Sequence, residues 1–204
     1  MPPKPKFKKE EIVTAAMEVV SEKGIESLTA QELRNILKCS ASPIFTVFNT
    51  MKEIQDEVRL AAMKRFEQYE IATVADMPIF KRIGMKMVMF GIQEPKLYQL
   101  LFMQEHGNTI TFDDVFGELG DTAKICIDAI EKDYALTAEQ AKLLFENVWI
   151  YTFGVGALCA TKVCYFSEEE LSQMLTTEFQ AMMMLIKSGA VYSNVKQETG
   201  EKLL

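Results

Sequence analysis

Apolar residues recur every three or four positions through most of the chain, a spacing that predicts amphipathic helices. The first such segment covers residues 8–23, and Gly24 follows it as a helix-ending signal. The apolar positions of this segment are Ile12, Ala15, Ala16, Val19 and Val20. They lie on one face of a helix, so the pattern predicts a helix packed on one side.

Two short helices are expected next. Thr29 is placed to cap a helix whose third residue is Glu32, a capping-box spacing. A three-residue turn, residues 38–40, leads to a further helix over about residues 41–47. Pro43 is compatible with that helix because it falls in the first turn, where its missing N–H has no intrahelical partner. Three helices with a tight turn between the second and third are therefore predicted.

The remaining pattern is helical as well. Two further capping spacings pair Thr137 with Gln140 and Ser167 with Glu170. Gly and Pro make up only 16 of the 204 residues, which leaves little turn chemistry for a β-rich fold. The sequence predicts an all-α protein of nine helices. The six later helices are expected over about 50–74, 78–91, 94–104, 112–133, 137–164 and 167–187, with a loop at 106–111.

The net charge of −7 is unevenly distributed. Residues 1–52 hold eight Lys and Arg against six Asp and Glu, whereas residues 53–204 hold 14 against 23. Phosphate affinity comes from Lys and Arg, so only the first region suits a nucleic-acid partner. We therefore expect an N-terminal domain over 1–52 and a helical second domain over 53–204.

Several classes of protein fit the sequence poorly. The single histidine, His106, lies in a polar stretch and is read as a loop residue, so no catalytic triad is expected. The four cysteines form no Cys-x-x-Cys pair, and neither a metal nor a cofactor is predicted. The basic start lacks the apolar core of a signal peptide, and the apolar stretches fall short of about 20 residues. We expect a cytoplasmic protein with reduced thiols and no membrane partner.

The three predicted N-terminal helices match the helix-turn-helix arrangement, which places its second helix in the DNA major groove. Residues at family-typical spacing are Ile12, Ala15, Ala16, Val19, Gly24, Leu28, Thr29, Leu33, Leu37, Ser40, Ile44, Phe45, Phe48, Lys52, Glu53 and Ile54. This run, over about residues 8–58, resembles the N-terminal domain of the TetR/AcrR family of transcription regulators. The resemblance implies a C-terminal part, here 59–188, that binds a small effector and dimerises. It includes a Trp-x-x-x-x-Gly segment from Trp149 to Gly154.

The sequence departs from the family at three places. Lys38 stands where the family usually has a turn glycine, so a positive φ there would strain the backbone. Met51 replaces a common phosphate-contacting lysine, a role that would pass to Lys52 or to backbone N–H groups. Phe153 replaces a histidine that often precedes the glycine, so an effector contact through an imidazole is not expected.

The predicted DNA-contacting surface is sparse. The recognition helix contains no Arg, Asn or Gln that could hold a base edge. Base discrimination would depend on thymine-methyl contacts, one hydroxyl and DNA shape, and affinity on phosphates. The tail lysines Lys4, Lys6, Lys8 and Lys9 are either further phosphate contacts or simply solvated, and the hydroxyls either contacts or helix caps. The predicted DNA-binding residues are Thr29, Lys38, Ser40, Ala41, Ser42, Pro43, Thr46 and Lys52.

Met and Phe side chains concentrate in the C-terminal region, where nine of 13 of each lie beyond residue 75. Flexible Met side chains beside aromatic ones can surround an apolar ligand, although a plain core has the same composition. The predicted effector-pocket residues are Met87, Phe90, Phe102, Met103, Phe116, Cys126, Phe145, Trp149 and Phe153. The last two helices have more apolar surface than one side can bury, which predicts a dimer interface. Its residues are Leu158, Tyr165, Leu175, Phe179, Met182 and Met183.

These observations favour a homodimeric transcription regulator, a repressor that binds a palindromic double-stranded DNA operator and is released by a small hydrophobic effector. The acidic second region favours a cationic effector over an anionic one. Because the recognition helix has no Arg, Asn or Gln, an alternative stays open: a helical ligand-binding or scaffold protein whose helix-turn-helix no longer recognises a specific DNA sequence. An enzyme is not expected, because no nucleophile and base are paired.

Overall fold

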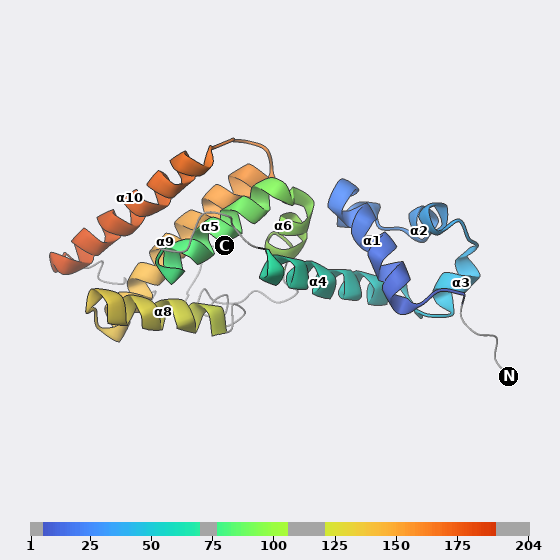
Figure 1. Cartoon of the computed structure of the whole chain (residues 1–204), viewed down its shortest axis with the longest axis horizontal. Coiled ribbons are helices and arrows are strands. Elements are labelled where there is room, and N and C mark those ends of the chain that lie inside the picture. Colours follow the sequence, from blue (N-terminus) through green and yellow to red (C-terminus); the bar gives the residue numbers. More distant parts are fainter. Residues whose placement is uncertain (1–5, 70–76, 106–120, 191–204) are drawn as a thin grey trace, which may run out of the picture.

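The structure, a computed structural model, describes residues 6–69, 77–105 and 121–190 of the 204-residue chain. In these ranges it contains nine α-helices, one short 3₁₀ helix and no strand, so the all-α prediction is confirmed (Figure 1). The α-helices are α1 (Lys9–Lys23), α2 (Ala30–Leu37), α3 (Ala41–Phe45), α4 (Met51–Gln68), α5 (Ile79–Gln93), α6 (Pro95–Phe102), α8 (Asp121–Tyr134), α9 (Ala138–Ala160) and α10 (Glu168–Lys187).

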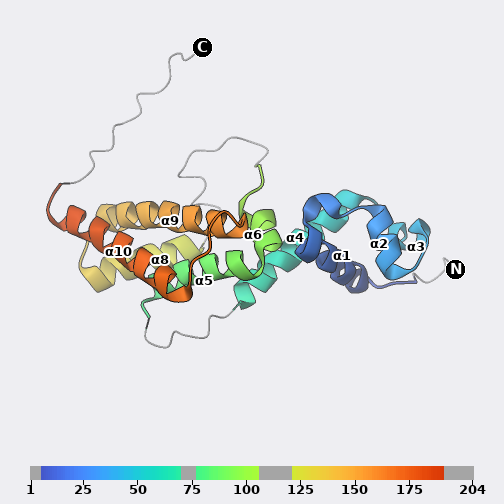
Figure 2. The same cartoon turned by 90° about the horizontal axis from the view of Figure 1, so that it is seen from above.

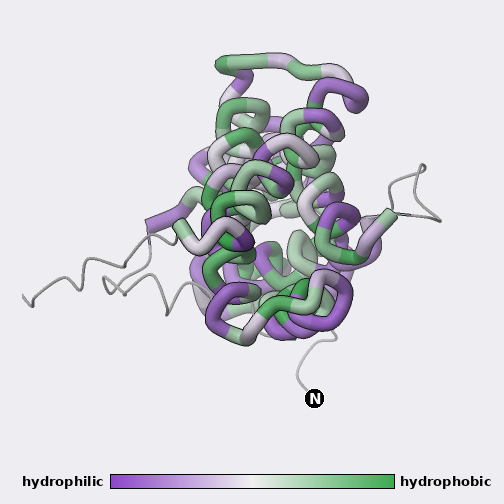
Figure 3. The backbone as a smooth tube through the Cα atoms, turned by 90° about the vertical axis from the view of Figure 1, so that its left-hand side faces the viewer, coloured by the Kyte–Doolittle hydropathy of each residue, from purple (hydrophilic) through white to green (hydrophobic). Residues whose placement is uncertain are grey.

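The helices form an elongated molecule with two ends. Helices α1, α2 and α3 lie at one end, α8, α9 and α10 at the other, and α4 runs between them (Figure 1). Figure 2 shows α5, α8, α9 and α10 extending along the same long direction, and α9 packs against α5, α6, α8 and α10. Seen end on, hydrophobic and hydrophilic residues alternate along the helices, as in amphipathic helices packed on one side (Figure 3).

The first helices form where the apolar spacing and the capping residues indicate the same helix positions. All five predicted apolar residues of α1 are buried. The Thr29 hydroxyl accepts a hydrogen bond from the backbone N–H of Glu32, which confirms Thr29 as the cap of α2. The two later capping boxes, Thr137 with Gln140 in α9 and Ser167 with Glu170 in α10, are also present in both directions.

Several helix ends differ from the prediction. Helix α4 ends at Gln68, and residues 70–74 of the expected helix lie outside the described residues. Helix α3 ends at Phe45 instead of residue 47. Helix α9 ends at Ala160, four residues early, because the Thr161 hydroxyl donates to the carbonyl of Ala157 at 2.7 Å and Lys162 adopts a left-handed φ of 58°. The expected loop 106–111, with His106, and the start of the helix 112–133 are outside the described residues.

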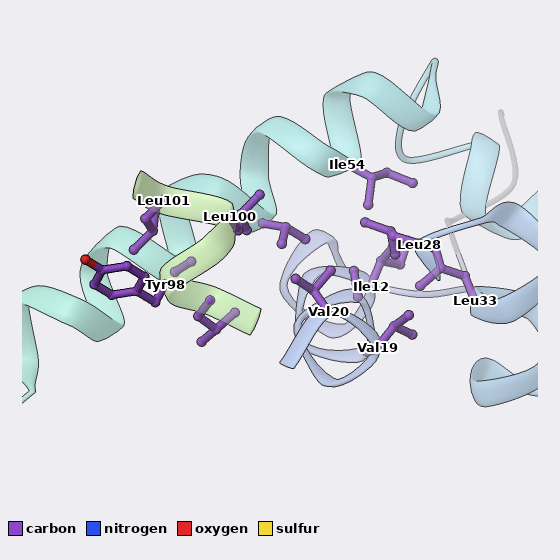
Figure 4. Packing of buried hydrophobic residues seen from close by; sticks show 14 of the residues in the cluster. Ile12, Val19, Val20, Leu28, Leu33, Ile54, Tyr98, Leu100 and Leu101 are labelled. Atoms are coloured by element: carbon purple, nitrogen blue, oxygen red, sulfur yellow. The ribbon is translucent and has the colours of Figure 1, made fainter. Parts of the chain in front are cut away.

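One buried cluster joins the N-terminal helices to the second part of the chain. It contains Ile12, Val20, Leu28, Leu33 and Ile54 and continues into α6 (Figure 4). Its α6 members are Leu97, Tyr98, Leu100 and Leu101. Residues on both sides of the expected boundary after residue 52 thus share one core, although that boundary itself stays a prediction.

Helix α9 is apolar along its whole length. By length and composition alone it could cross a membrane, with a mean hydropathy of 1.4 over 18 residues, which differs from the expectation drawn from shorter apolar stretches. Its contacts with four neighbouring helices identify another reason for that composition. A helix surrounded by other helices is apolar on most of its faces.

Candidate nucleic-acid interface and ligand cavity

The turn between α2 and α3 has the backbone geometry that a helix-turn-helix needs. Lys38 adopts φ 49° and ψ 50°, in the left-handed region, and the N–H of Cys39 donates to the carbonyl of Arg34 at 3.2 Å. A left-handed residue at this position normally ends a helix as glycine. The positive φ expected at Lys38 is therefore present, and lysine carries a strain that glycine would not.

Helix α3 is anchored on one side and open on the other. Ile44 is fully buried and Phe48, just beyond the helix, is 3% exposed, so both fix α3 onto the core. Ser42 and Thr46 are exposed, and Ala41 and Pro43 are half-buried. None of the eight predicted DNA-binding residues lies in the core, and Thr29, Lys38, Ser40 and Lys52 are all exposed.

Two of the hydroxyl groups at this surface already make hydrogen bonds within the chain. The hydroxyl of Thr29 accepts from the N–H of Glu32 at 3.2 Å, and that of Thr46 donates to the carbonyl of Ser42 at 2.8 Å. Ser40 precedes α3 but makes no side-chain capping bond. The capping interpretation thus describes Thr29, whereas the hydroxyl of Ser40 has no capping role.

Cations around α3 differ in their availability. Lys9 pairs with Glu57 at 2.6 Å and lies 5.8 Å from the ring centroid of Phe48. The ion pair with Glu57 neutralises Lys9, one of the four tail lysines. Another of them, Lys4, lies outside the described residues. Lys38 and Lys52 are exposed and form no ion pair with a described carboxylate, so they are the better candidates for phosphate contacts.

Phe45 is a surface residue that the sequence does not reveal. Although Phe45 is a large apolar residue of a helix that packs on the core, it is 38% exposed on α3. Its neighbour Ile44 takes the inward position instead. An exposed aromatic ring on this helix adds an apolar group beside the thymine-methyl contacts expected from Ala41 and Pro43.

A cavity of about 890 Å³ lies among α4, α5, α6, α8, α9 and α10. This volume falls within the range of small-molecule sites. One side is an unbroken series of aromatic contacts, in which the ring of Phe80 lies 5.9 Å from that of Phe145 and 5.7 Å from that of Phe179. Phe179 in turn lies 5.0 Å from the ring of Tyr134. All four rings line the cavity, so its wall suits an apolar ligand.

Two charged residues are among the described lining residues. Lys81, in the first turn of α5, is half-buried, and its ammonium donates to the hydroxyl of Thr176 at 2.7 Å. Glu67, on α4, is exposed. In residues 6–69, 77–105 and 121–190, no three His, Cys, Asp or Glu side chains gather as a metal site would require.

The predicted pocket residues fall into three groups. Met87, Phe102, Phe145 and Trp149 line the cavity. Phe90 and Cys126 are fully buried in the core, and burial raises the pKa of the Cys126 thiol to about 11. Met103 is exposed, Phe153 stacks on Trp149 with ring centroids 5.3 Å apart, and Phe116 lies outside the described residues. The lining side chains that the sequence analysis missed include Phe66, Phe80, Ile83 and Val148.

The predicted dimer residues divide between surface and cavity. Leu158 and Tyr165 are exposed by 40% and 82%, as an interface requires, and Met182 is half-buried. Leu175, Phe179 and Met183 line the cavity instead. Because Leu175 and Met183 are buried within the chain, they have little surface to offer a second copy. Ile150, Val163 and Met184 are exposed apolar residues that the sequence analysis did not assign.

A helix-turn-helix unit joined through one helix to a helical bundle with an apolar cavity is the architecture of TetR-like regulators. The chain has this fold. A TetR variant from Acinetobacter baumannii AYE in complex with minocycline is 15% identical with a TM-score of 0.54, covering 91% of this chain and 99% of its own. A TetR family protein from Vibrio parahaemolyticus is 18% identical with a TM-score of 0.56, covering 86% and 98%. No family model and no curated protein matches the sequence.

Proposed function

We propose that this protein is a transcription regulator that binds a palindromic DNA operator as a homodimer. The observation that supports this most is the pairing of an open α3 with a left-handed turn at Lys38. This is the arrangement that allows a recognition helix to enter the major groove while the preceding helix crosses the backbone. The proposed contacts are Thr29, Lys38, Ser40, Ala41, Ser42, Pro43, Thr46 and Lys52.

We further propose that the cavity binds a small hydrophobic effector that releases the DNA. Helix α4 connects the two sites: Ile54, Val58 and Ala62 are buried in the N-terminal core, whereas Met63 and Phe66 line the cavity. A ligand that fits one position of α4 better than another shifts the separation of the two α3 helices away from one DNA turn, about 34–36 Å.

The homodimer would form through the exposed apolar side chains of α9, α10 and the turn between them. Leu158, Tyr165 and Val163 lie on this surface. Two copies related by a twofold axis present two α3 helices to a palindromic site. Sedimentation of the protein at several concentrations tests this, and a monomer throughout contradicts it.

Fluorescence anisotropy with the DNA upstream of its own gene tests the DNA-binding proposal. Specific binding should exceed binding to bulk DNA and fall steeply as salt rises. The substitution Lys52→Ala removes one phosphate contact per protomer, so the salt slope should become shallower by about 2 in the dimer. Lys64→Ala removes an exposed cation near the C-terminal end of α4, remote from α3, and should leave both affinity and slope unchanged.

Two outcomes would contradict the proposal. If Lys52→Ala and Lys64→Ala change the DNA affinity and the salt slope equally, α3 and the start of α4 do not form the DNA interface. A folded protein that shows no preference over bulk DNA at any salt would instead favour the ligand-binding or scaffold alternative, which the absence of Arg, Asn and Gln from α3 supports.

A further inference from the structure

We infer that the cavity takes an anionic amphiphile, in which an apolar body lies along the aromatic wall and a carboxylate or similar group meets Lys81. The inference rests on the proposed effector role of the cavity and specifies the chemistry of its ligand. It reverses the sign of charge that the acidic composition of residues 53–204 favours. The local wall decides this sign, because interactions between charges separated by more than a Debye length, about 8 Å, are largely screened.

Lys81 is the one cation among the described lining residues. Its ammonium is half-buried, and its partner is the neutral hydroxyl of Thr176 at 2.7 Å. No ion pair joins it to a described carboxylate. An ammonium has three donors, so this one retains hydrogen-bonding capacity directed to a partner of opposite charge.

The position of Lys81 in its helix adds to the positive potential. It is the third residue of α5, in the turn whose backbone N–H groups have no partner within the helix. That turn contains no acidic residue, so the positive end of the helix dipole is not offset by a carboxylate of its own.

Glu67, the other charged lining residue, does not reverse this balance. It lies on α4 and is exposed to solvent, where water stabilises its carboxylate without a bound cation. Most of the remaining wall is aromatic and aliphatic, with Phe80 in contact with both Phe145 and Phe179, and its other polar residues, such as Thr152 and Gln180, are uncharged. One anionic head and one apolar body are thus the chemistry that the described wall complements.

Three probes with the same alkyl chain separate the contribution of the head group: dodecanoate, dodecanol and dodecyltrimethylammonium, each below its micelle-forming concentration. Trp149 is the only tryptophan in the chain and lines the cavity, so its emission reports occupancy without a label. We expect dodecanoate to bind about tenfold more tightly than dodecanol, as a charge-assisted hydrogen bond at a half-buried site predicts. The trimethylammonium compound should bind more weakly than either.

Two matched variants locate the effect. Lys81→Met should weaken dodecanoate about tenfold, to the affinity of dodecanol, and change dodecanol less than twofold. Arg82→Met removes the neighbouring positive charge, which is exposed and does not line the cavity, and should leave all three affinities unchanged.

Each contrary result has a distinct meaning. Equal binding of the three probes, tightest binding of the cation, or a dodecanoate preference that survives Lys81→Met overturns the anionic class and leaves the cavity as a ligand site. Failure of all three probes to bind overturns the effector role of the cavity as well. The DNA-binding proposal is measured separately by anisotropy and is unaffected by either result.

Discussion

Two glycines allow helices α5, α6 and α9 to approach closely around one tyrosine. A Cβ added at Gly156 would lie 2.9 Å from Cζ of Tyr98 and closer still to its hydroxyl oxygen. Tyr98 is fully buried, and its hydroxyl donates to the carbonyl of Phe153 at 3.4 Å. The ring is also close to α5 on its other side, since a Cβ added at Gly91 would lie 3.1 Å from its Cδ2. We therefore predict that Gly156→Ala destabilises the protein.

The magnitude follows from two opposing effects. Replacing glycine by alanine inside a helix stabilises by about 0.5–1 kcal/mol. Overpacking a close-packed core costs about 1–3 kcal/mol, and here the obstacle is a ring held between two helices. The net cost at Gly156 should be about 1–2 kcal/mol. Gly154, in the same helix, has nothing within 4 Å of an added Cβ, so Gly154→Ala should show the stabilising effect alone.

Thermal and urea unfolding at one protein concentration measure this difference. The two variants should differ by about 2 kcal/mol, which for a chain of this length is about 4–8 °C in Tm. Adding Tyr98→Phe to Gly156→Ala removes the closest atom and should recover part of the loss, a coupling that a double-mutant cycle isolates. Equal stability of the two alanine variants, or no recovery with phenylalanine, would show that the contact at Tyr98 does not limit the packing.

Three further predictions concern single groups. Lys38→Gly should raise the free energy of unfolding by about 0.5–1 kcal/mol, because glycine adopts the positive φ without strain, and should weaken DNA binding by removing a cation. A lower stability of this variant in urea unfolding would show that Lys38 is not strained. Burial raises the pKa of Cys126 to about 11, so iodoacetamide at pH 8 should label exposed Cys164 well before it, as read by peptide mass mapping. Hydrogen bonds from Asn49 lower the pKa of the Glu53 carboxyl below its ordinary value of 4.5. The stability that these hydrogen bonds contribute is therefore complete above pH 4.5 and disappears as the pH falls through the lowered pKa of Glu53. Glu53→Gln should destabilise the protein at pH 7 by an amount that shrinks in acid, and a loss of stability that does not change with pH would refute this prediction.

Helix positions near the N-terminus could be predicted because several local signals agree there. Apolar spacing, the glycine after α1 and the cap at Thr29 each indicate the same boundaries, and the structure contains them. The end of α9 could not be predicted in the same way. It depends on the Thr161 hydroxyl and on a left-handed Lys162, whereas the apolar pattern itself continues to Cys164. Local pattern therefore places a helix better than it places the residue where the helix stops.

The candidate sites differ in how far sequence could locate them. The proposed DNA-contacting surface is local, so the turn at Lys38 and the positions of α3 follow from spacing within one short stretch of the chain. The cavity is built from six helices, and which side chains line it depends on how these helices are rotated against one another. Phe80 and Phe90 lie on the same helix and are equally apolar in sequence, yet Phe80 lines the cavity and Phe90 is fully buried in the core.

The apolar residues of α10 show why a cavity and an interface are hard to separate by sequence. Both need side chains beyond those that fill the core, and both leave the same helical periodicity. Burial alone does not separate them either: Leu175 and Met183 are buried within the chain and Met184 is 72% exposed, yet all three line the cavity. The apolar surface that one copy could offer to a second is therefore better judged from exposed residues outside the cavity lining, such as Leu158 and Tyr165.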